Sequence, residues 1–308
     1  MKYLTETIRD IFSKNIELLG DMDQAVYYFR EQEYEKALVL VANSVDGIKY
    51  TIEAIIQDRE YFNLVNTESM LEMLSGILNA KKNSDFVLLA DLLELQLINF
   101  LLGVQELIIS KEEIIFDVDN YWDNIKLLME RGVGITEEFN DSVNTAVLLD
   151  SGYRVEFTSC GLMTLAAENE GAKFYFHTNS RIKAEAFMLA SKWHQKDAVS
   201  YQIYGLGMGY HIKALCSMAP KAKIVIFEAD RNVIQLACAF SDLKELLSNP
   251  RVKLIYDPEL KHLQETLADP TVDETFLVHY PSYKNLRSKE LKQVFESVLP
   301  WSKAIEAC

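Results

Sequence analysis

The sequence predicts a two-domain α/β protein, with an N-terminal all-helical bundle followed by a Rossmann-like domain whose sheet is mostly parallel. Three observations lead to this fold class. Residues 1–115 show helical periodicity, with no proline and few glycines. Beyond residue 180, short apolar runs alternate with helical patterns, as they do in βαβ units. A glycine-rich turn, Gly205 to Gly209, follows the first of these runs.

The composition is that of a globular protein with more than one domain. The 308 residues exceed a typical domain, and 49% hydrophobic with 25% charged residues are ordinary values for a chain with a core. A net charge of −15 argues against general binding to nucleic acid or to anionic membranes. The four cysteines are scattered, which is typical of reduced thiols. No signal peptide and no apolar run near the ~20 residues of a membrane span is evident, so we expect a soluble, cytoplasmic protein.

The first domain, residues 1–115, is expected to be an antiparallel helical bundle. Gly20 is predicted to end its first helix, and Thr67 and Ser84 are predicted N-caps of later ones. The predicted helices cover residues 4–19, 25–29, 34–56, 67–78 and 85–109.

Three acids, Asp85, Asp91 and Glu94, lie among the leucines of the last of these helices. They could form a metal or catalytic cluster, or they could lie on the solvated edge of an amphipathic helix. The bundle contains no histidine, and so it lacks the Glu-x-x-His ligands of a di-iron site. We therefore favour the solvated edge.

The second domain is expected to span residues 116–308, with a small antiparallel β extension at about residues 150–180. The extension is predicted from alternation at 153–157 and β signals at 165–167 and 174–177. The strands that follow should form a mostly parallel sheet with helices on both faces and a ligand at their carboxyl ends. The predicted elements are helices at 121–130 and 181–194, a strand near 202, and then helix 210–218, strand 223–227, helix 232–240, strand 252–256, helix 261–267, strand 275–278 and helix 288–298.

The turn between the first strand and its helix carries glycine at Gly205, Gly207 and Gly209. Residues without Cβ let the backbone turn tightly and lie close to a ligand. The helix that begins at Tyr210 offers free N–H groups and a partial positive charge, and the ring of Tyr210 could stack on a base or sugar of the ligand. This pattern predicts a nucleotide or nucleoside ligand, although a tight turn kept for packing in a degenerate Rossmann domain would look the same.

The spacing of this turn is similar to the GxGxG turn of S-adenosylmethionine-dependent methyltransferases. That resemblance implies that Glu228, at the end of the second strand, binds ribose hydroxyls and that Asp257, after the third, contacts adenine. Asp230 completes a Glu-x-Asp strand end. The sequence departs from those enzymes at Ile203, where they usually carry an acid. The alternative is that these acids are solvated carboxylates at loop positions.

His211, in the first turn of the glycine helix, and His279, after the fourth strand, could meet over one cleft as general base or substrate ligand. Tyr283 belongs to the Pro-aromatic segment 279–283, where many methyltransferases hold the acceptor. His177 and Asn179 could line the mouth of the cleft. The alternative is that each histidine is a polar surface residue. No metal-ligand spacing and no nucleophile elbow occurs, and we predict no metal site.

Several stretches resemble the N-terminal region of the bacterial motility accessory factor family, which is linked to flagellin glycosylation with nonulosonic acids. They are FHTNSRIKAEAF, YGLGMGYHIKAL, IFEADRNVIQLACAFSDLKELL and NPRVKLIYD, and the resemblance covers residues 120–300. Residues 1–115, especially VLLADLLELQL, look like a helical domain of unassigned function found in Firmicutes. The resemblance implies flagellin or glycosylation enzymes as partners. The family's glycosyltransferase domain normally follows this region, and its transfer activity is not expected of a chain that ends at Cys308.

Two functions follow as hypotheses. In the first, the second domain binds S-adenosylmethionine or a nucleotide sugar and resembles a methyltransferase or another group transferase. In the second, the chain is a non-catalytic accessory protein whose helical domain recruits a partner. Whether the protein is an enzyme stays open, and the helical domain could also support a homo-oligomer.

Overall fold

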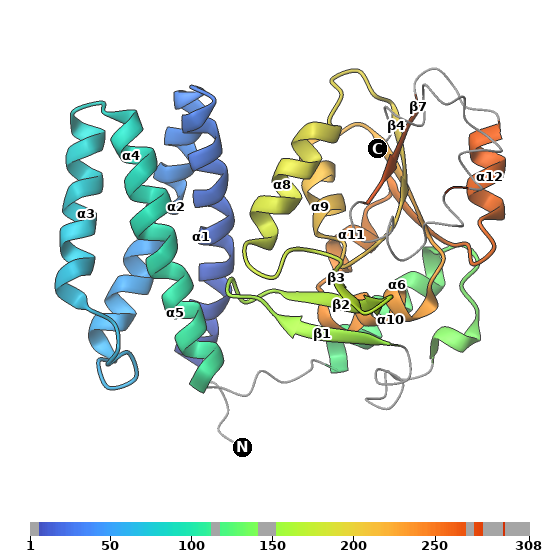
Figure 1. Ribbon diagram of the computed structural model, residues 1–308, viewed down its shortest axis with the longest axis horizontal. Helices are drawn as coiled ribbons and strands as arrows, with labels where there is room; N and C mark the ends of the chain where they lie inside the picture. Colours follow the sequence, from blue (N-terminus) through green and yellow to red (C-terminus); the bar gives the residue numbers. More distant parts are fainter. Residues whose placement is uncertain (1–5, 112–117, 141–151, 269–273, 280–291, 293–308) are drawn as a thin grey trace. The chain divides into compact units, whose positions relative to one another are not determined.

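A computed structural model describes residues 6–111, 118–140, 152–268, 274–279 and 292 (Figure 1). It confirms the predicted class, a helical bundle followed by an α/β region with a parallel sheet and a small antiparallel sheet. The chain forms two compact units. The helical unit comprises Met1–Ile115, Thr158–Leu162 and Ser180–Ala184. The α/β unit comprises Phe116–Phe157, Met163–Asn179 and Glu185–Cys308.

The helical unit is built on a tight pair, α1 and α2, with α5 packed against α1. Its helices are α1 (Glu6–Arg30), α2 (Tyr34–Gln57), α3 (Thr67–Lys82), α4 (Phe86–Leu92) and α5 (Ile98–Lys111), with a π-helical turn at Leu93–Leu97 between the last two. A core cluster that includes Ile8, Ile11, Ile55 and Ile108 joins α1, α2 and α5. Burial of this apolar stripe, rather than helix propensity, stabilises the bundle.

The prediction that Gly20 ends the first helix is wrong, because α1 continues to Arg30 and includes the predicted short helix 25–29. A glycine inside a helix costs about 1 kcal/mol relative to alanine. Met22 and Val26 are buried beyond it and continue the same apolar face. Burial of each such side chain contributes about 1.5–3 kcal/mol, so the helix runs through the glycine.

Both predicted N-caps are one residue out of place. Asn66, not Thr67, caps α3, because its side chain accepts hydrogen bonds from two backbone N–H groups. Asp85, not Ser84, caps α4 and accepts from the N–H of Leu88 at 3.0 Å. Asn outranks Thr as an N-cap, and Ser84 has φ +55°, outside the β-region backbone that an N-cap typically has.

The continuous helix Phe86–Lys111 is long and apolar enough to cross a membrane by length and composition alone, which the sequence analysis did not predict. A core helix of a soluble bundle passes the same test. Asp91 and Glu94 on this helix accept from Arg30 of α1 at 2.6 and 3.0 Å. All three side chains are partly exposed, as expected for a solvated edge. We therefore interpret Phe86–Lys111 as a helix of the bundle.

The α/β unit contains a four-stranded parallel sheet in the order β6-β5-β4-β7. The strands are β4 (Ser200–Tyr204), β5 (Lys223–Glu228), β6 (Val252–Tyr256) and β7 (Glu274–Val278). Numbered by their appearance in the chain, they follow the order 3-2-1-4 of a Rossmann half-sheet. The chain changes direction across the sheet between β4 and β7, so a crevice for a ligand is expected at their carboxyl ends.

Helices cover both faces of this sheet, and Figure 1 shows α9 and α12 on opposite sides of it. The α-helices are α6 (Val118–Arg131), α8 (Ile182–Trp193), α9 (Tyr210–Met218), α10 (Arg231–Phe240), α11 (Lys244–Ser248) and α12 (Lys261–Ala268), with a 3-10 helix at Glu137–Asn140. α11 was not predicted, and the predicted helix 288–298 lies outside the described residues.

The predicted β extension is confirmed as an antiparallel sheet in the order β1-β2-β3. Its strands are β1 (Tyr153–Phe157), β2 (Met163–Asn169) and β3 (Ala172–Tyr175). Gly171, with φ +78°, makes the turn between β2 and β3. The chain then leaves β3 so that His177 reaches the carboxyl edge of the parallel sheet, where its ring lies 4.7 Å from that of His279.

Asn124 of α6 provides a test of how the α/β unit is held together. Its buried Nδ2 donates to the carbonyls of Cys238 and Ser241 at the end of α10, at 2.9 and 3.1 Å. Asn124→Leu would leave both carbonyls without this donor, and we expect a loss of about 1–3 kcal/mol. The three tryptophans, Trp122, Trp193 and Trp301, all belong to the α/β unit, so urea unfolding followed by their fluorescence reports on it. Exposed Lys126→Leu is the matched control, and equal losses in both variants would contradict this role.

Candidate functional site at the carboxyl edge of the sheet

The glycine turn after β4 has a backbone conformation that other residues adopt only with strain. Gly205, Gly207 and Gly209 have φ values of +107°, +51° and +80°. A Cβ on Gly207 would lie 2.9 Å from Nε2 of His177 and 3.1 Å from Cε1 of His279. Glycine is therefore needed at position 207 both for its backbone angle and for the space that two imidazoles occupy.

The carboxylate of Glu228 points to the glycine turn and is fully buried. Its Oε2 accepts from the N–H of Leu206 at 3.0 Å, and its Oε1 accepts from the N–H of Asp230 at 2.9 Å. Hydrogen bonds from backbone N–H groups to a carboxylate are stronger than neutral ones. Glu228 thus ties the turn after β4 to the end of β5.

The other predicted binding residues also have hydrogen-bond partners within the chain. Asp230 caps α10 and accepts from the hydroxyl of Tyr153 at 2.6 Å. Asp257 is buried and accepts from the N–H of Leu263, in the first turn of α12, at 2.8 Å. Tyr210 donates its hydroxyl to a carbonyl of β2 at 3.0 Å. These four contacts order the carboxyl edge of the sheet, and they leave the ligand role of each residue a prediction.

Three histidines that are far apart in the sequence meet at this edge. His177 follows β3, His211 lies in the first turn of α9, and His279 follows β7 directly. The rings of His211 and His279 stack with centroids 3.8 Å apart, and the His177 ring lies 4.7 Å from His279 and 5.4 Å from His211. All three are buried, with at most 2% of any of them exposed. The structure thus brings His211 and His279 together, as the sequence analysis allowed, but it places His177 inside rather than at the mouth of a cleft.

The hydrogen bonds of two of these rings fix where their protons lie. Nε2 of His211 is 3.2 Å from the carbonyl oxygen of Gly205, which can only accept, so Nε2 carries the hydrogen. Nδ1 of His211 is then a buried lone pair with no hydrogen-bond partner. The N–H of Met208 donates to Nε2 of His177 at 3.2 Å, so the hydrogen of His177 is on Nδ1, 3.5 Å from Oε1 of Glu185.

Burial lowers the pKa of His211 well below its usual value, and the charge of a protonated His177 would lower it further, while the Gly205 carbonyl opposes the shift. Burial likewise lowers the pKa of His279 well below its usual value, and the neighbouring His211 and His177 add to that effect. Both imidazoles are therefore neutral at pH 7.

The sequence analysis expected His211 and His279 to meet and His177 to lie at the mouth of the cleft, but it did not predict a cluster of three, because it searched for metal ligands by local spacing. The three histidines are separated by 34 and 68 positions, which matches no metal-ligand motif. Glu185 of α8, beside His177, was not singled out either. The remaining histidines, His194 and His262, are exposed and lie outside the cluster. The predicted catalytic residue Tyr283 lies outside the described residues.

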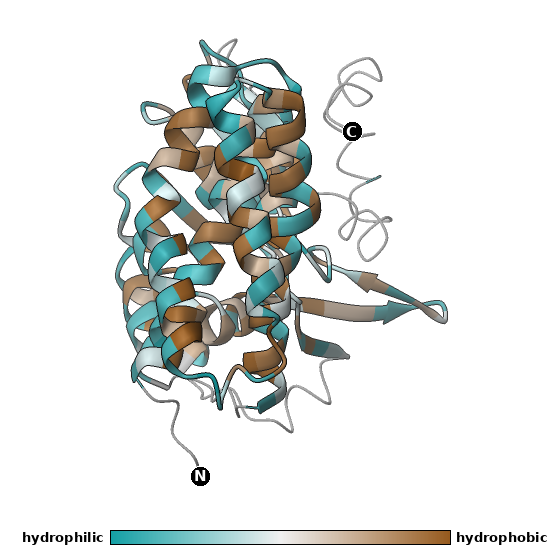
Figure 2. Cartoon of the chain, turned by 90° about the vertical axis from the view of Figure 1, so that its left-hand side faces the viewer, coloured by the Kyte–Doolittle hydropathy of each residue, from teal (hydrophilic) through white to brown (hydrophobic). Residues whose placement is uncertain are grey.

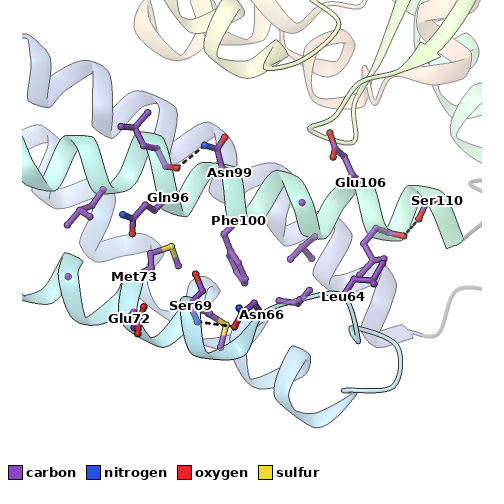
Figure 3. A pocket seen from close by; sticks show the side chains of 18 residues that line it. Leu64, Asn66, Ser69, Glu72, Met73, Gln96, Asn99, Phe100, Glu106 and Ser110 are labelled. Carbon is purple, nitrogen blue, oxygen red and sulfur yellow. Dashed lines mark hydrogen bonds between the residues drawn. The ribbon is translucent and has the colours of Figure 1, made fainter.

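A groove lies in the helical unit, between α3 and the helix formed by α4 and α5 (Figure 3). Figure 3 shows Phe100 directed from α5 towards α3, where Met73 faces it. Leu64 and Leu95 border the groove and are 78% and 65% exposed. Figure 2 shows further apolar residues on the outward faces of these helices.

Comparison with known proteins adds a domain assignment for the helical unit. Residues 6–107 match a family model described as a domain of unknown function (DUF8042). No curated protein matches the chain. One similar solved structure is the crystal structure of MnmC2 from Aquifex aeolicus, with 15% identity and a TM-score of 0.28 over 59% of this chain and 70% of that one. At that TM-score the likeness supports no inference about this chain.

Two substitutions separate the stability cost of a Cβ packed at position 207 from the stability cost of the positive φ there. Gly171→Ala introduces a Cβ into open space at a similar positive φ, and we expect a cost of about 1–2 kcal/mol from the backbone alone. Gly207→Ala must also displace the two imidazoles and should cost clearly more. Urea unfolding followed by tryptophan fluorescence measures both. Equal losses would mean that the histidines do not pack against the turn.

The lowered pKa values of His211 and His279 predict how stability depends on pH. The unfolded chain takes up protons below about pH 6.5, whereas these two folded imidazoles do not, so stability is full above that pH and falls as the pH drops towards the folded-state values. The slope should approach about 2.7 kcal/mol per pH unit for two groups. Urea unfolding between pH 7.5 and 5.5, with a chelator present, measures it. The double variant His194→Gln/His262→Gln should keep the slope, and a flat profile in the parent protein would contradict burial of neutral rings.

Proposed function

We propose that the α/β unit binds a small molecule of the nucleotide class, S-adenosylmethionine or a nucleotide sugar, at the carboxyl ends of β4 and β5, and that it is a group-transfer protein. The observation that carries the proposal is the 3.0 Å hydrogen bond from the Leu206 N–H to Glu228. It brings the glycine turn and the strand-end acid together at the edge where Rossmann-like sheets bind ligands. A sugar-bearing ligand could then contact both.

The chemical groups at this edge are of the kinds that bind a nucleotide. Glu228 accepts from two backbone N–H groups, and a ribose hydroxyl would bind its carboxylate beside them or in place of one of them. The N-terminus of α9 favours a negatively charged group. The inner side of the turn, however, is filled by His177 and His279. Because Glu228 is fully buried, binding also requires the edge to open.

If transfer occurs, the chain's own contribution would be a base beside the donor. His211 presents an unprotonated Nδ1 at this edge, and its lowered pKa keeps that atom free to accept a proton at pH 7. A nucleotide cofactor would supply the transferred group, and the acceptor is not specified by these residues.

A second candidate is a non-catalytic accessory protein, favoured by the internal hydrogen bonds of Glu228, Asp230 and Asp257. In this role the glycine turn and its acids stabilise the fold. The helical unit recruits a partner through the groove between α3 and the helix formed by α4 and α5. From the family resemblance, we propose that this partner is flagellin or one of its glycosylation enzymes, in the cytoplasm. A second copy of the chain is the alternative partner.

Isothermal titration with S-adenosylmethionine, S-adenosylhomocysteine and a panel of nucleotide sugars tests ligand binding. We expect one of them to bind, and Glu228→Gln to weaken it at least about tenfold, since an amide cannot replace both acceptors. The exposed acid variant Glu245→Gln should bind like the parent. Absence of heat with every ligand would remove the first candidate.

Capture of host proteins on the immobilised full chain, with identification by mass spectrometry, tests the second candidate. Leu95→Glu places a charge on the groove and should reduce recovery of flagellin or glycosylation enzymes about tenfold or more. Val45→Glu, on an exposed site of α2 outside the groove, is the control. Recovery that does not respond to Leu95→Glu would show that the groove is not the binding surface.

A further inference from the structure

We infer that His177, His211 and His279 form a binding site for one divalent transition-metal ion of the Zn²⁺ type. This site uses imidazole nitrogens and none of the proposed nucleotide-binding carboxylates or glycine amides, and an ion on Nδ1 of His211 would take the place of the base role proposed for that atom. Each residue can offer one nitrogen such that the three lie within 4.8 Å of one another. Two histidine ligands of a tetrahedral Zn²⁺ ion have nitrogens about 3.3 Å apart, given Zn–N bonds of about 2.0–2.1 Å. The nitrogens would therefore have to approach from at most 4.8 Å, and the parallel rings of His211 and His279 would have to tilt so that both lone pairs point at one ion.

The first argument for the site is an unsatisfied nitrogen. Nδ1 of His211 is completely buried and carries no hydrogen, and it has no hydrogen-bond partner among the residues that the structure describes. A buried acceptor without a donor costs about 1–3 kcal/mol and calls for an explanation. A metal ion would bind such a lone pair. The His279 ring, stacked parallel at 3.8 Å, brings further imidazole nitrogens close to it, and these reach the same ion once the two rings tilt.

The second argument comes from the hydrogen bonds of the ring nitrogens that would not bind the ion. Histidines that bind metals usually donate their other ring N–H to a backbone carbonyl or a carboxylate, which fixes the tautomer. His211 donates Nε2–H to the carbonyl of Gly205, which leaves Nδ1 for the ion. His177 directs Nδ1–H towards Glu185, 3.5 Å away, which leaves Nε2 for the ion in place of the Met208 N–H. Both tautomers are therefore already those that metal binding needs.

The third argument is the ligand chemistry. Three neutral imidazoles suit Zn²⁺, Cu²⁺, Ni²⁺ and Fe²⁺, and they do not suit Mg²⁺ or Ca²⁺, which take oxygen ligands. Three protein ligands also leave a fourth position open, as in zinc sites that bind water or substrate. The ion would link the segment after β3, the start of α9 and the end of β7, and so close the edge of the sheet.

The test uses the untagged full chain, freed of metal with a chelator and titrated with Co²⁺, which reports its ligands by visible absorption. We expect one equivalent to bind with tetrahedral d–d bands and without a thiolate charge-transfer band. Burial raises the pKa of Cys216 to about 11 and of Cys238 to about 12, so neither thiol should compete. Zn²⁺ should displace Co²⁺ and raise the melting temperature of the chain.

Variants locate the ion. His211→Gln and His279→Gln should each weaken Co²⁺ binding at least about a hundredfold, because loss of a ligand exceeds the 10–100-fold effect of an outer contact. The double variant His194→Gln/His262→Gln, which removes both exposed histidines, should bind like the parent. If a site variant fails to fold, the visible spectrum of the Co²⁺-loaded parent protein still tests the inference. An octahedral spectrum, binding through thiolate, loss of binding in the exposed-histidine variant, or no binding at micromolar Co²⁺ would each overturn the inference.

Discussion

The carboxyl edge of the parallel sheet depends on one carboxylate. Glu228 is fully buried, and it accepts from the backbone on both sides of the edge, at Leu206 in the glycine turn and at Asp230 beyond β5. A buried carboxylate is tolerated only with such partners. Because the turn is fixed by this acid, α9 begins at Tyr210 and His211 is held with its ring over the edge. The position of His211 therefore depends on the turn that Glu228 holds.

The edge combines two kinds of site in one place. Acid, backbone amides and a helix N-terminus are the features that Rossmann-like domains use for nucleotides. Three neutral imidazoles are the features of a transition-metal site. Here they are adjacent, because the 3-2-1-4 strand order brings the residue after β7 beside the turn after β4, while the β extension adds His177 from outside the sheet. The helical unit, which has its own core and its own groove, does not contribute to either set.

Much of this fold could be predicted from the sequence because its elements carry strong local patterns. β4 to β7 are short apolar runs, and α9 lies between a glycine turn and Pro220, so all were placed within a residue or two. The errors occurred where tertiary burial outweighs a local signal, as at Gly20, or where two capping residues are adjacent, as at Asn66 and Thr67. The role of Glu228 was predicted only as an acid near the turn, since no pattern shows that both of its oxygens are used internally. The meeting of His211 and His279 was expected from their places at one edge of the sheet, whereas the burial of His177 beside them depends on a third chain segment and could not be predicted.

The central claim is that His177, His211 and His279 are buried together and bind one metal ion through ring nitrogens. Long-range ¹H–¹⁵N NMR of the imidazole rings at pH 7, before and after one equivalent of Zn²⁺, tests it most directly. The account predicts an Nδ1–H tautomer for His177 and an Nε2–H tautomer for His211, with the nitrogens of three of the five histidines shifting on addition of metal while His194 and His262 stay unchanged. Opposite tautomers, or shifts confined to His194 and His262, would contradict it.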